Sequence, residues 1–139
     1  MGRIFTLGYG GMSLDEFMEI LRENGVETVV DVRRFPTSKV EEFKKERLRA
    51  ELERRGFSYI HIEELGGFRG GYQRYMKSQD FRKGLERLEN IARKSVSAII
   101  CVEENPAWCH RRHIARSLER RGWEVVHLRR RSSARSARR

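Results

Sequence analysis

The densest group of reactive side chains lies in residues 101–111, with the sequence Cys-Val-Glu-Glu-Asn-Pro-Ala-Trp-Cys-His-Arg. A cysteine near the first turn of a helix feels the positive end of the helix dipole, and neighbouring His110 and Arg111 favour the thiolate further. Cys109 is therefore a candidate nucleophile, metal ligand or redox thiol. The alternative is a small apolar residue at a strand-to-helix turn, and for Cys101, inside an apolar run, we expect that structural role.

Acid–base groups accompany this cysteine. Glu103 follows the apolar run and suits a general base or a partner that holds an arginine, and His110 suits an acid, a base or a ligand. Asp31 lies in the apolar run Val-Val-Asp-Val, so it must be paired, for example with Arg33 or Arg111, or take part in the reaction. The candidate catalytic residues are Glu103, His110, Cys109 and Asp31.

The cysteines do not match familiar thiol or zinc motifs. A phosphatase loop has a cysteine, five residues and then an arginine, but that arginine position holds Ala107 or Ala115. A rhodanese-like persulfide loop is unsupported, and no Cys-x-x-Cys knuckle suits structural zinc. His110 and His113 could share a helix face and hold one divalent ion with a carboxylate such as Glu103 or Asp31, which is the minor alternative. We predict no metal site and no other cofactor.

Basic side chains and glycines favour a phosphate ligand. Arginine forks bind phosphate bidentately, and backbone amides at a glycine turn or helix start can assist. The candidate anion-binding residues are Tyr9, Gly10, Arg33, Arg34, Ser38 and Arg111. In the competing interpretation these arginines pair with acids such as Asp31 and Glu103. NAD is disfavoured, because Gly8-x-Gly10 lacks the third glycine of a dinucleotide-binding turn and basic residues replace the ribose-binding acid.

Alternating β-branched runs and helical patterns would position these residues. Strands are predicted at residues 4–7, 28–32, 57–61, 98–102 and 124–128. Helices are predicted from Ser13 to Gly25, around Leu48 and Leu52 before Gly56, from about Ser78, and from Asn105-Pro106 to Gly122. This order predicts a single-domain, three-layer, Rossmann-like α/β fold with an open, mainly parallel sheet of about five strands and helices on both faces. Ligands bind at the carboxyl edge of such sheets, where the candidate residues would meet.

The segment 62–77 is longer than most connections in a compact domain. It contains four glycines and the aromatic residues Phe68, Tyr72 and Tyr75. Long loops of this kind are commonly lids or binding loops.

Several of these segments together resemble the domain of unknown function 488 family. They are Thr6–Tyr9, Asp31–Pro36 with Ser38, Tyr59–His61 followed by Leu65–Gly67, and the 101–111 segment. The motifs occur in order at compatible spacing and span roughly residues 3 to 128. The resemblance implies a single α/β domain, and it implies no particular activity.

Charge is unevenly distributed along the 139 residues. The formal net charge is +10, but six arginines lie in residues 129–139, which contain no acid, so residues 1–128 hold 24 basic and 20 acidic side chains. We predict a domain over 1–128 and a disordered, arginine-rich tail over 129–139. The tail suits nucleic acid or another polyanion, or it serves solubility. The mixed charges of residues 44–55 predict a solvated helix face.

Composition indicates a soluble, cytoplasmic protein without membrane contact. No run of 18 apolar residues exists, the N-terminus lacks the apolar core of a secretory signal, and two cysteines suit a reducing compartment. A charged fraction of 36% beside few Asn and Gln leans toward a thermophilic source.

Three functions are consistent with these patterns. The first is an enzyme, a hydrolase or transferase, acting on a nucleotide, nucleic acid or other phosphate-containing substrate at the carboxyl edge. The second is a non-catalytic nucleic-acid-binding or adaptor domain, in which the same residues form a buried polar network. The third is a thiol- or metal-dependent redox or sensor protein that depends on Cys109.

Overall fold

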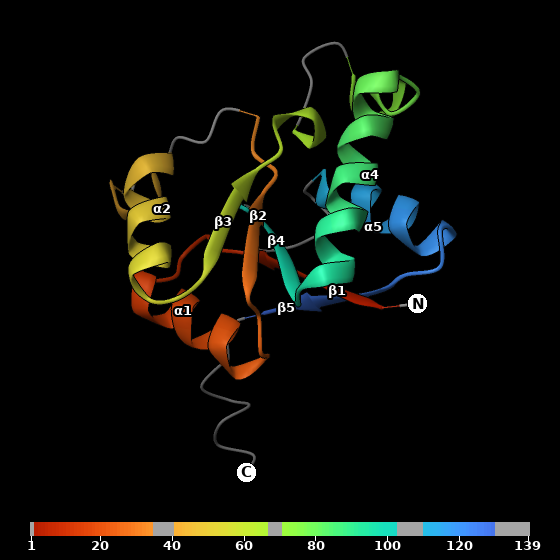
Figure 1. Cartoon of the computed structure of the whole chain (residues 1–139). Coiled ribbons are helices and arrows are strands. Elements are labelled where there is room, and N and C mark those ends of the chain that lie inside the picture. The colour runs from red at the N-terminus through yellow and green to blue at the C-terminus, as the bar shows by residue number, and fades with distance from the viewer. Residues whose placement is uncertain (1, 35–40, 67–70, 103–109, 130–139) are drawn as a thin grey trace.

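Five strands form one parallel sheet in the computed structural model, which describes residues 2–34, 41–66, 71–102 and 110–129 (Figure 1). The strands are β1 Arg3–Gly8, β2 Thr28–Asp31, β3 Ser58–His61, β4 Ser97–Cys101 and β5 Glu124–Leu128. Their order is β3-β2-β4-β1-β5, and every neighbouring pair runs parallel. The predicted single-domain α/β fold is confirmed, and the sheet is wholly rather than mainly parallel.

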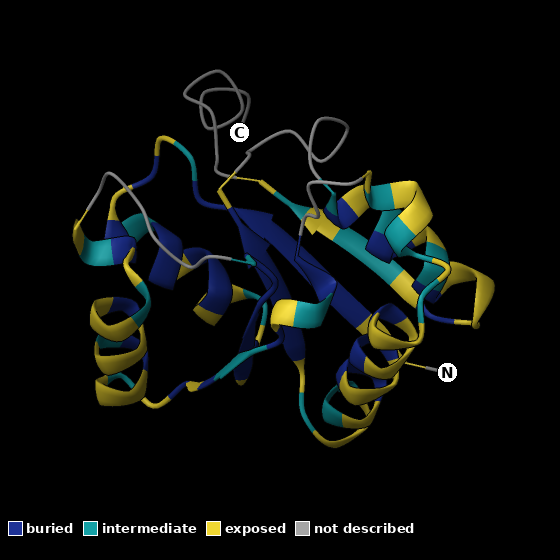
Figure 2. Ribbon diagram, turned by 90° about the horizontal axis from the view of Figure 1, so that it is seen from above, coloured by how far each residue is buried: buried dark blue, intermediate teal, exposed yellow. Residues whose placement is uncertain are grey.

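Helices cover both faces of the sheet, which gives the predicted three layers (Figure 2). On one face lie α1 Leu14–Glu23 and α2 Lys45–Arg54, and on the other α4 Gln79–Lys94 and α5 Arg111–Arg120. Three short helices join these elements: η1 Glu41–Phe43, η2 Glu63–Leu65 and α3 Tyr72–Tyr75. No described helix combines the length and the apolar character that crossing a bilayer requires.

Side-chain alternation along the inner strands supplies two separate cores. In β1, Phe5 belongs to the core under α1 and α2, whereas Ile4 belongs to the core under α4 and α5. In β2, Val29 and Val30 divide between the two cores in the same way. A strand covered on both faces has no polar side to its pattern, which explains the continuous apolar runs of the sequence.

Local sequence signals set most helix ends. The Ser13 side chain accepts a hydrogen bond from the Glu16 amide at 3.1 Å. Gly25 follows the end of α1 with a φ of 71°, in the left-handed region that favours glycine. The start of α5 differs from the prediction. The helix begins at Arg111, whereas the sequence favoured Asn105-Pro106, and an Asn-Pro pair initiates turns as well as helices. Both of those residues lie outside the described ranges.

The structure describes the predicted long loop and the predicted tail only in part. Within segment 62–77, the chain forms η2 and α3, and the Tyr72 hydroxyl donates to the Leu65 carbonyl at 2.9 Å. Phe68 of this segment lies outside the described residues, as do residues 130–139 of the predicted tail.

Candidate functional site

The carboxyl ends of β1, β2 and β4 lie side by side, with β4 in the middle. Backbone pairing continues past the strands, because the Tyr9 amide donates to the Cys101 carbonyl at 3.0 Å and the Gly10 amide to the Val102 carbonyl at 2.8 Å. The chain leaves β1 and β2 toward α1 and α2, whereas the helix after β4 lies on the opposite face. Ligands of open α/β sheets bind at such a divergence.

Asp31, at the end of β2, is wholly buried and paired with Arg33. The Arg33 guanidinium donates from Nε to Oδ1 at 2.8 Å and from Nη2 to Oδ2 at 2.6 Å, and the Arg33 amide donates to Oδ1 at 3.1 Å. Its Nη1 donates to the Tyr9 hydroxyl and to the Phe43 carbonyl, both at 2.8 Å. The predicted pairing of Asp31 with an arginine is confirmed.

Two tyrosines complete this buried network. The Tyr59 hydroxyl donates to Asp31 Oδ2 at 2.5 Å, and the Tyr9 ring stacks on Phe43 at 4.2 Å between centroids. Burial and the charge of Asp31 raise the pKa of Tyr59. Burial alone would lower the pKa of Arg33, but the hydrogen bonds and charge of Asp31 raise it. The ion pair therefore stays charged beneath a protonated tyrosine, with Arg33 only 6% exposed.

Two histidines flank the chain where it leaves β2. His110 Nε2 lies 3.0 Å from the Val32 carbonyl oxygen, and His61 Nε2 lies 2.5 Å from the Arg33 carbonyl oxygen. Because a carbonyl can only accept, each ring carries a proton on Nε2, and Nδ1 is the basic nitrogen of the neutral ring. Asp31 holds the same turn through the Arg33 amide, so the buried ion pair and both imidazoles are joined through a few backbone atoms.

Arg111, the first residue of α5, is a fully buried cation. Its Nη1 donates to Thr6 Oγ1 at 2.8 Å, and Thr6 Oγ1 lies 2.6 Å from His127 Nδ1. The Thr6 hydroxyl therefore lies between Arg111 and His127, and the tautomer of His127 sets which of Thr6 and His127 donates. The first turn of α5 contains no acid, so the charge of Arg111 adds to the positive end of the helix dipole.

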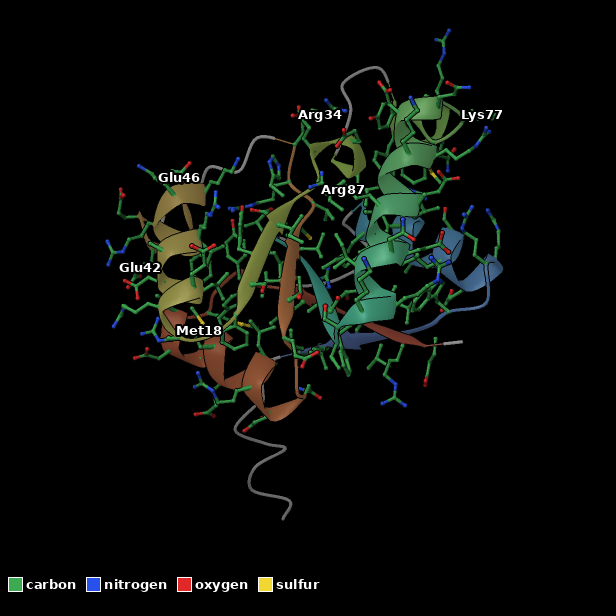
Figure 3. All side chains as sticks on the ribbon, in the orientation of Figure 1. Met18, Arg34, Glu42, Glu46, Lys77 and Arg87 are labelled. Atoms are coloured by element: carbon green, nitrogen blue, oxygen red, sulfur yellow. The ribbon has the colours of Figure 1, made fainter. Side chains whose placement is uncertain are left out.

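Arg34 is a further cation of this edge and lies against an aromatic ring. The Arg34 guanidinium lies 5.2 Å from the centre of the Tyr75 ring, and Figure 3 labels Arg34 at the end of β2. A Cβ at Gly66 would overlap the Arg34 backbone, so the close approach of η2 to this turn requires glycine. The Tyr72 ring contacts His110 at 5.4 Å and His113 at 5.5 Å between centroids.

His113 is the described histidine of this group with a shifted pKa. Partial burial lowers its pKa, and the positive charges of Arg112, Arg116 and His110 lower it further. Its neutral form is therefore favoured near pH 7.

The predicted site residues divide into three sets. The first is locked into the buried network or the backbone ladder and comprises Asp31, Arg33, Tyr9 and Gly10. The second lies at the carboxyl edge and comprises Arg34, His110 and Arg111. The third, Glu103, Cys109 and Ser38, lies outside the described residues. Cys101 is buried in β4, as expected for a structural cysteine.

Metal ligands do not cluster in the part of the chain that the structure describes. No group of three or more His, Cys, Asp or Glu side chains there could hold an ion. Asp31, suggested as a ligand beside His110 and His113, is instead held by Arg33 and Tyr59.

Sequence reasoning assigned no role to Thr6 or Tyr59. Thr6 lies in the apolar run Ile-Phe-Thr-Leu, and a polar side chain within a buried run needs a partner. The same signal drew attention to Asp31, and it could have identified Thr6. Tyr59 offered no comparable signal, because tyrosine is common in strands.

A family model supports the resemblance noted from the motifs. The model for Domain of unknown function DUF488 matches residues 13–71 and 66–118. No curated protein and no solved structure matches the chain.

Proposed function

The chain belongs to the Domain of unknown function DUF488 family, and we propose that it is an enzyme acting on a phosphate-containing substrate, a nucleotide or nucleic acid, at the carboxyl edge of its sheet. The observation that supports this most strongly is a pair of histidines. His61 and His110 each donate from Nε2 to a backbone carbonyl, and the two carbonyls belong to neighbouring residues of the turn after β2. Both rings are half-buried and lie on either side of one turn, with Arg34 as its next residue.

Two anchored imidazoles suit transfer of a phosphoryl group. Imidazole exchanges protons near neutral pH, so one ring can accept the proton of the attacking hydroxyl or water. As the new phosphorus–oxygen bond forms, the bond to the leaving oxygen breaks, and the other ring supplies that oxygen with a proton. In this proposal His110 and His61 transfer these protons through Nδ1.

Positive charge at the same edge would stabilise the phosphoryl oxygens. Arg34 is half-buried and would contact the substrate, whereas buried Arg111 would act through its field together with the amino end of α5. Asp31 and Arg33 would be positioning residues, because they bind each other and fix the carbonyls that hold the imidazoles. Three further residues remain predicted members of this site. Glu103 would act as a base, Cys109 as a nucleophile or a polar support, and Ser38 as a ligand of the anion.

The test is turnover of phosphate esters by histidine variants. Wild-type protein would be assayed with bis(p-nitrophenyl) phosphate and with a labelled oligonucleotide, beside His110→Gln, His61→Gln and the control Lys83→Gln at an exposed position of α4. We expect His110→Gln to lower kcat by about 100-fold or more and Lys83→Gln to leave it near wild type. Arg34→Gln should raise KM. The proposal is wrong if His110→Ala and Glu103→Ala proteins keep wild-type ligand affinity and turnover.

The buried network favours a second candidate function, a non-catalytic nucleic-acid-binding or adaptor domain. Asp31, Arg33 and Tyr9 satisfy one another inside the core, as expected if such residues serve the fold rather than a reaction. This alternative predicts that nucleic-acid binding survives His110→Gln. Binding should instead collapse with added salt or on deletion of residues 129–139.

A further inference from the structure

The groove between α3 and α5 is a second basic surface, separate from the carboxyl-edge site. It has a volume of about 370 Å³ and is lined by Gln73, Met76, Lys77, His113, Arg116, Ser117 and Arg120. This lining contains no acidic side chain. We propose that this α3–α5 groove binds the sugar–phosphate backbone of a nucleic-acid strand.

The cations of this groove have no carboxylate partner among the residues that the structure describes. Lys77, Arg116 and Arg120 are exposed, and none of them forms an ion pair with another described residue. Arg116 and Arg120 are four residues apart, so they lie one above the other on the helix and repel each other. A bound polyanion would remove that repulsion.

Several other exposed arginines of the described residues are paired. Arg121, directly after α5, contacts Glu89 at 2.8 Å. In α2, Arg49 contacts Glu53 at 3.3 Å, four residues further along the helix. Arg82 and Arg87 of α4 form no ion pair among the described residues, so the groove is distinguished by cations that gather in one hollow whose lining holds no carboxylate.

Other hollows of the described surface are less suited to a polyanion. One contains Arg93 and Lys94 but also Glu27 and Glu124. Another contains Arg22 and Arg55 together with three carboxylates, Asp15, Glu19 and Glu23. Carboxylates so close to the cations would repel phosphate groups.

The arrangement favours a polymer over a single phosphate. Arg116 and Arg120 are separated by about 6 Å along α5, and Lys77 lies beyond α3 on the other wall (Figure 3). Cations spread in this way suit successive phosphates. Tyr72 packs against His113 of the groove and also against His110, so this half-buried ring connects the groove with the carboxyl edge.

The experiment compares two double variants of the full chain that lose the same charge. Arg116→Gln/Arg120→Gln alters the groove, and Arg47→Gln/Arg49→Gln alters exposed arginines of α2. Fluorescence anisotropy would measure binding to labelled oligo(dT) and oligo(U) over a range of salt concentrations. We expect the groove variant to bind about tenfold more weakly, with a salt slope smaller by about 1.4, and the control to stay within about twofold of wild type.

Each outcome decides the proposal. Loss of binding to DNA alone, RNA alone or both supports it and identifies the strand. Wild-type affinity of the groove variant, or an equal loss in the α2 control, overturns it. Groove-dependent binding to phosphatidylserine vesicles without oligonucleotide binding also overturns it. His110→Gln reports separately on the carboxyl-edge reaction, so an active groove with unchanged His110→Gln turnover would refute only the proposed enzyme.

Discussion

Helices α2 and α5 are both ten residues long and rich in arginine, yet they differ in whether these arginines form ion pairs with carboxylates. In α2, Glu51 accepts hydrogen bonds from Arg54 at 2.5 Å and Arg55 at 3.0 Å, and the bond from Arg54 lowers the pKa of Glu51. In α5, Arg116 and Arg120 have no such partner among the described residues. The difference shows that net charge says little about binding until acids at helical spacing are taken into account.

The same contrast continues below the surface. On the α2 side, Arg33 is neutralised by the carboxylate of Asp31. On the α5 side, buried Arg111 donates to the neutral hydroxyl of Thr6. The Asp31 carboxylate thus neutralises Arg33 on the α2 side, whereas on the α5 side Arg116 and Arg120 form no ion pair among the described residues.

The largest expected effect on stability comes from removing the negative charge that neutralises Arg33. Asp31→Asn leaves the buried Arg33 guanidinium without a counter-charge, so we expect the free energy of unfolding to fall by about 3 to 5 kcal/mol. Urea denaturation followed by circular dichroism measures this loss. Tyr59→Phe leaves the ion pair in place and removes one hydrogen bond to the charged Asp31, which should cost about 1.5 to 3 kcal/mol. Equal losses from the two variants would show that the ion pair does not dominate this region.

A smaller loss is expected from the α5 side. Thr6→Val removes the acceptor of Arg111, and a hydrogen bond to a charged group contributes about 1.5 to 3 kcal/mol. Thr28→Val is the matched control, because Thr28 Oγ1 bonds only the neutral Ser95 hydroxyl at 2.8 Å. The Thr6 variant should therefore unfold at a lower urea concentration than the Thr28 variant. The reverse order would mean that Arg111 draws little stability from Thr6.

The crowding of cations on the α5 side also predicts a pH dependence. The folded pKa of His113 lies below its ordinary value of 6.5, so the unfolded chain takes up a proton first as the pH falls. The stability associated with neutral His113 is complete above about pH 6.5 and is lost as the pH falls toward the folded pKa. Denaturation midpoints of wild type and His113→Gln should diverge across this window. Parallel pH profiles would contradict the prediction.

The smallest effect tests the two helices directly. Arg47→Gln/Arg49→Gln removes ion pairs and should slightly lower the free energy of unfolding, whereas Arg116→Gln/Arg120→Gln relieves repulsion and should slightly raise it. Thermal melts at low and high salt would measure both shifts. The opposite signs should fade as salt screens the charges. Shifts of the same sign would show that α5 is not strained by its own arginines.

Much of the fold could be predicted from local patterns. Apolar runs identified all five strands to within one residue at each end, because buried parallel strands leave no polar alternation. The Ser13 and Ser78 caps were equally evident, since they depend on hydroxyls beside their own helices. The start of α5 was placed too early, because the helix begins at Arg111, and the Asn105-Pro106 pair that suggested the start lies outside the described residues.

The candidate site was predicted less completely. Strand order places Asp31, Arg33 and His110 near one edge, as expected from the βα pattern, but their partners belong to distant segments. Tyr59 is 28 residues from Asp31, and Thr6 is 105 residues from Arg111. No local spacing encodes such pairs. The sequence pattern therefore suggested Arg33 as a partner of Asp31, but it could not show that Tyr59 joins this pair or that Thr6 binds Arg111.

The sequence alone determined the layered α/β architecture and the set of residues at the carboxyl edge, because strand and helix periodicity and parallel connectivity are properties of neighbouring residues. Only the tertiary structure decided which charges are neutralised. Arg33 meets Asp31 in the core, whereas Arg116 and Arg120 face a groove without carboxylates. The physical reason is that the energy between two charges depends on their distance and on their burial. Two arginines of equal formal charge differ in both, and the sequence pattern does not give either quantity.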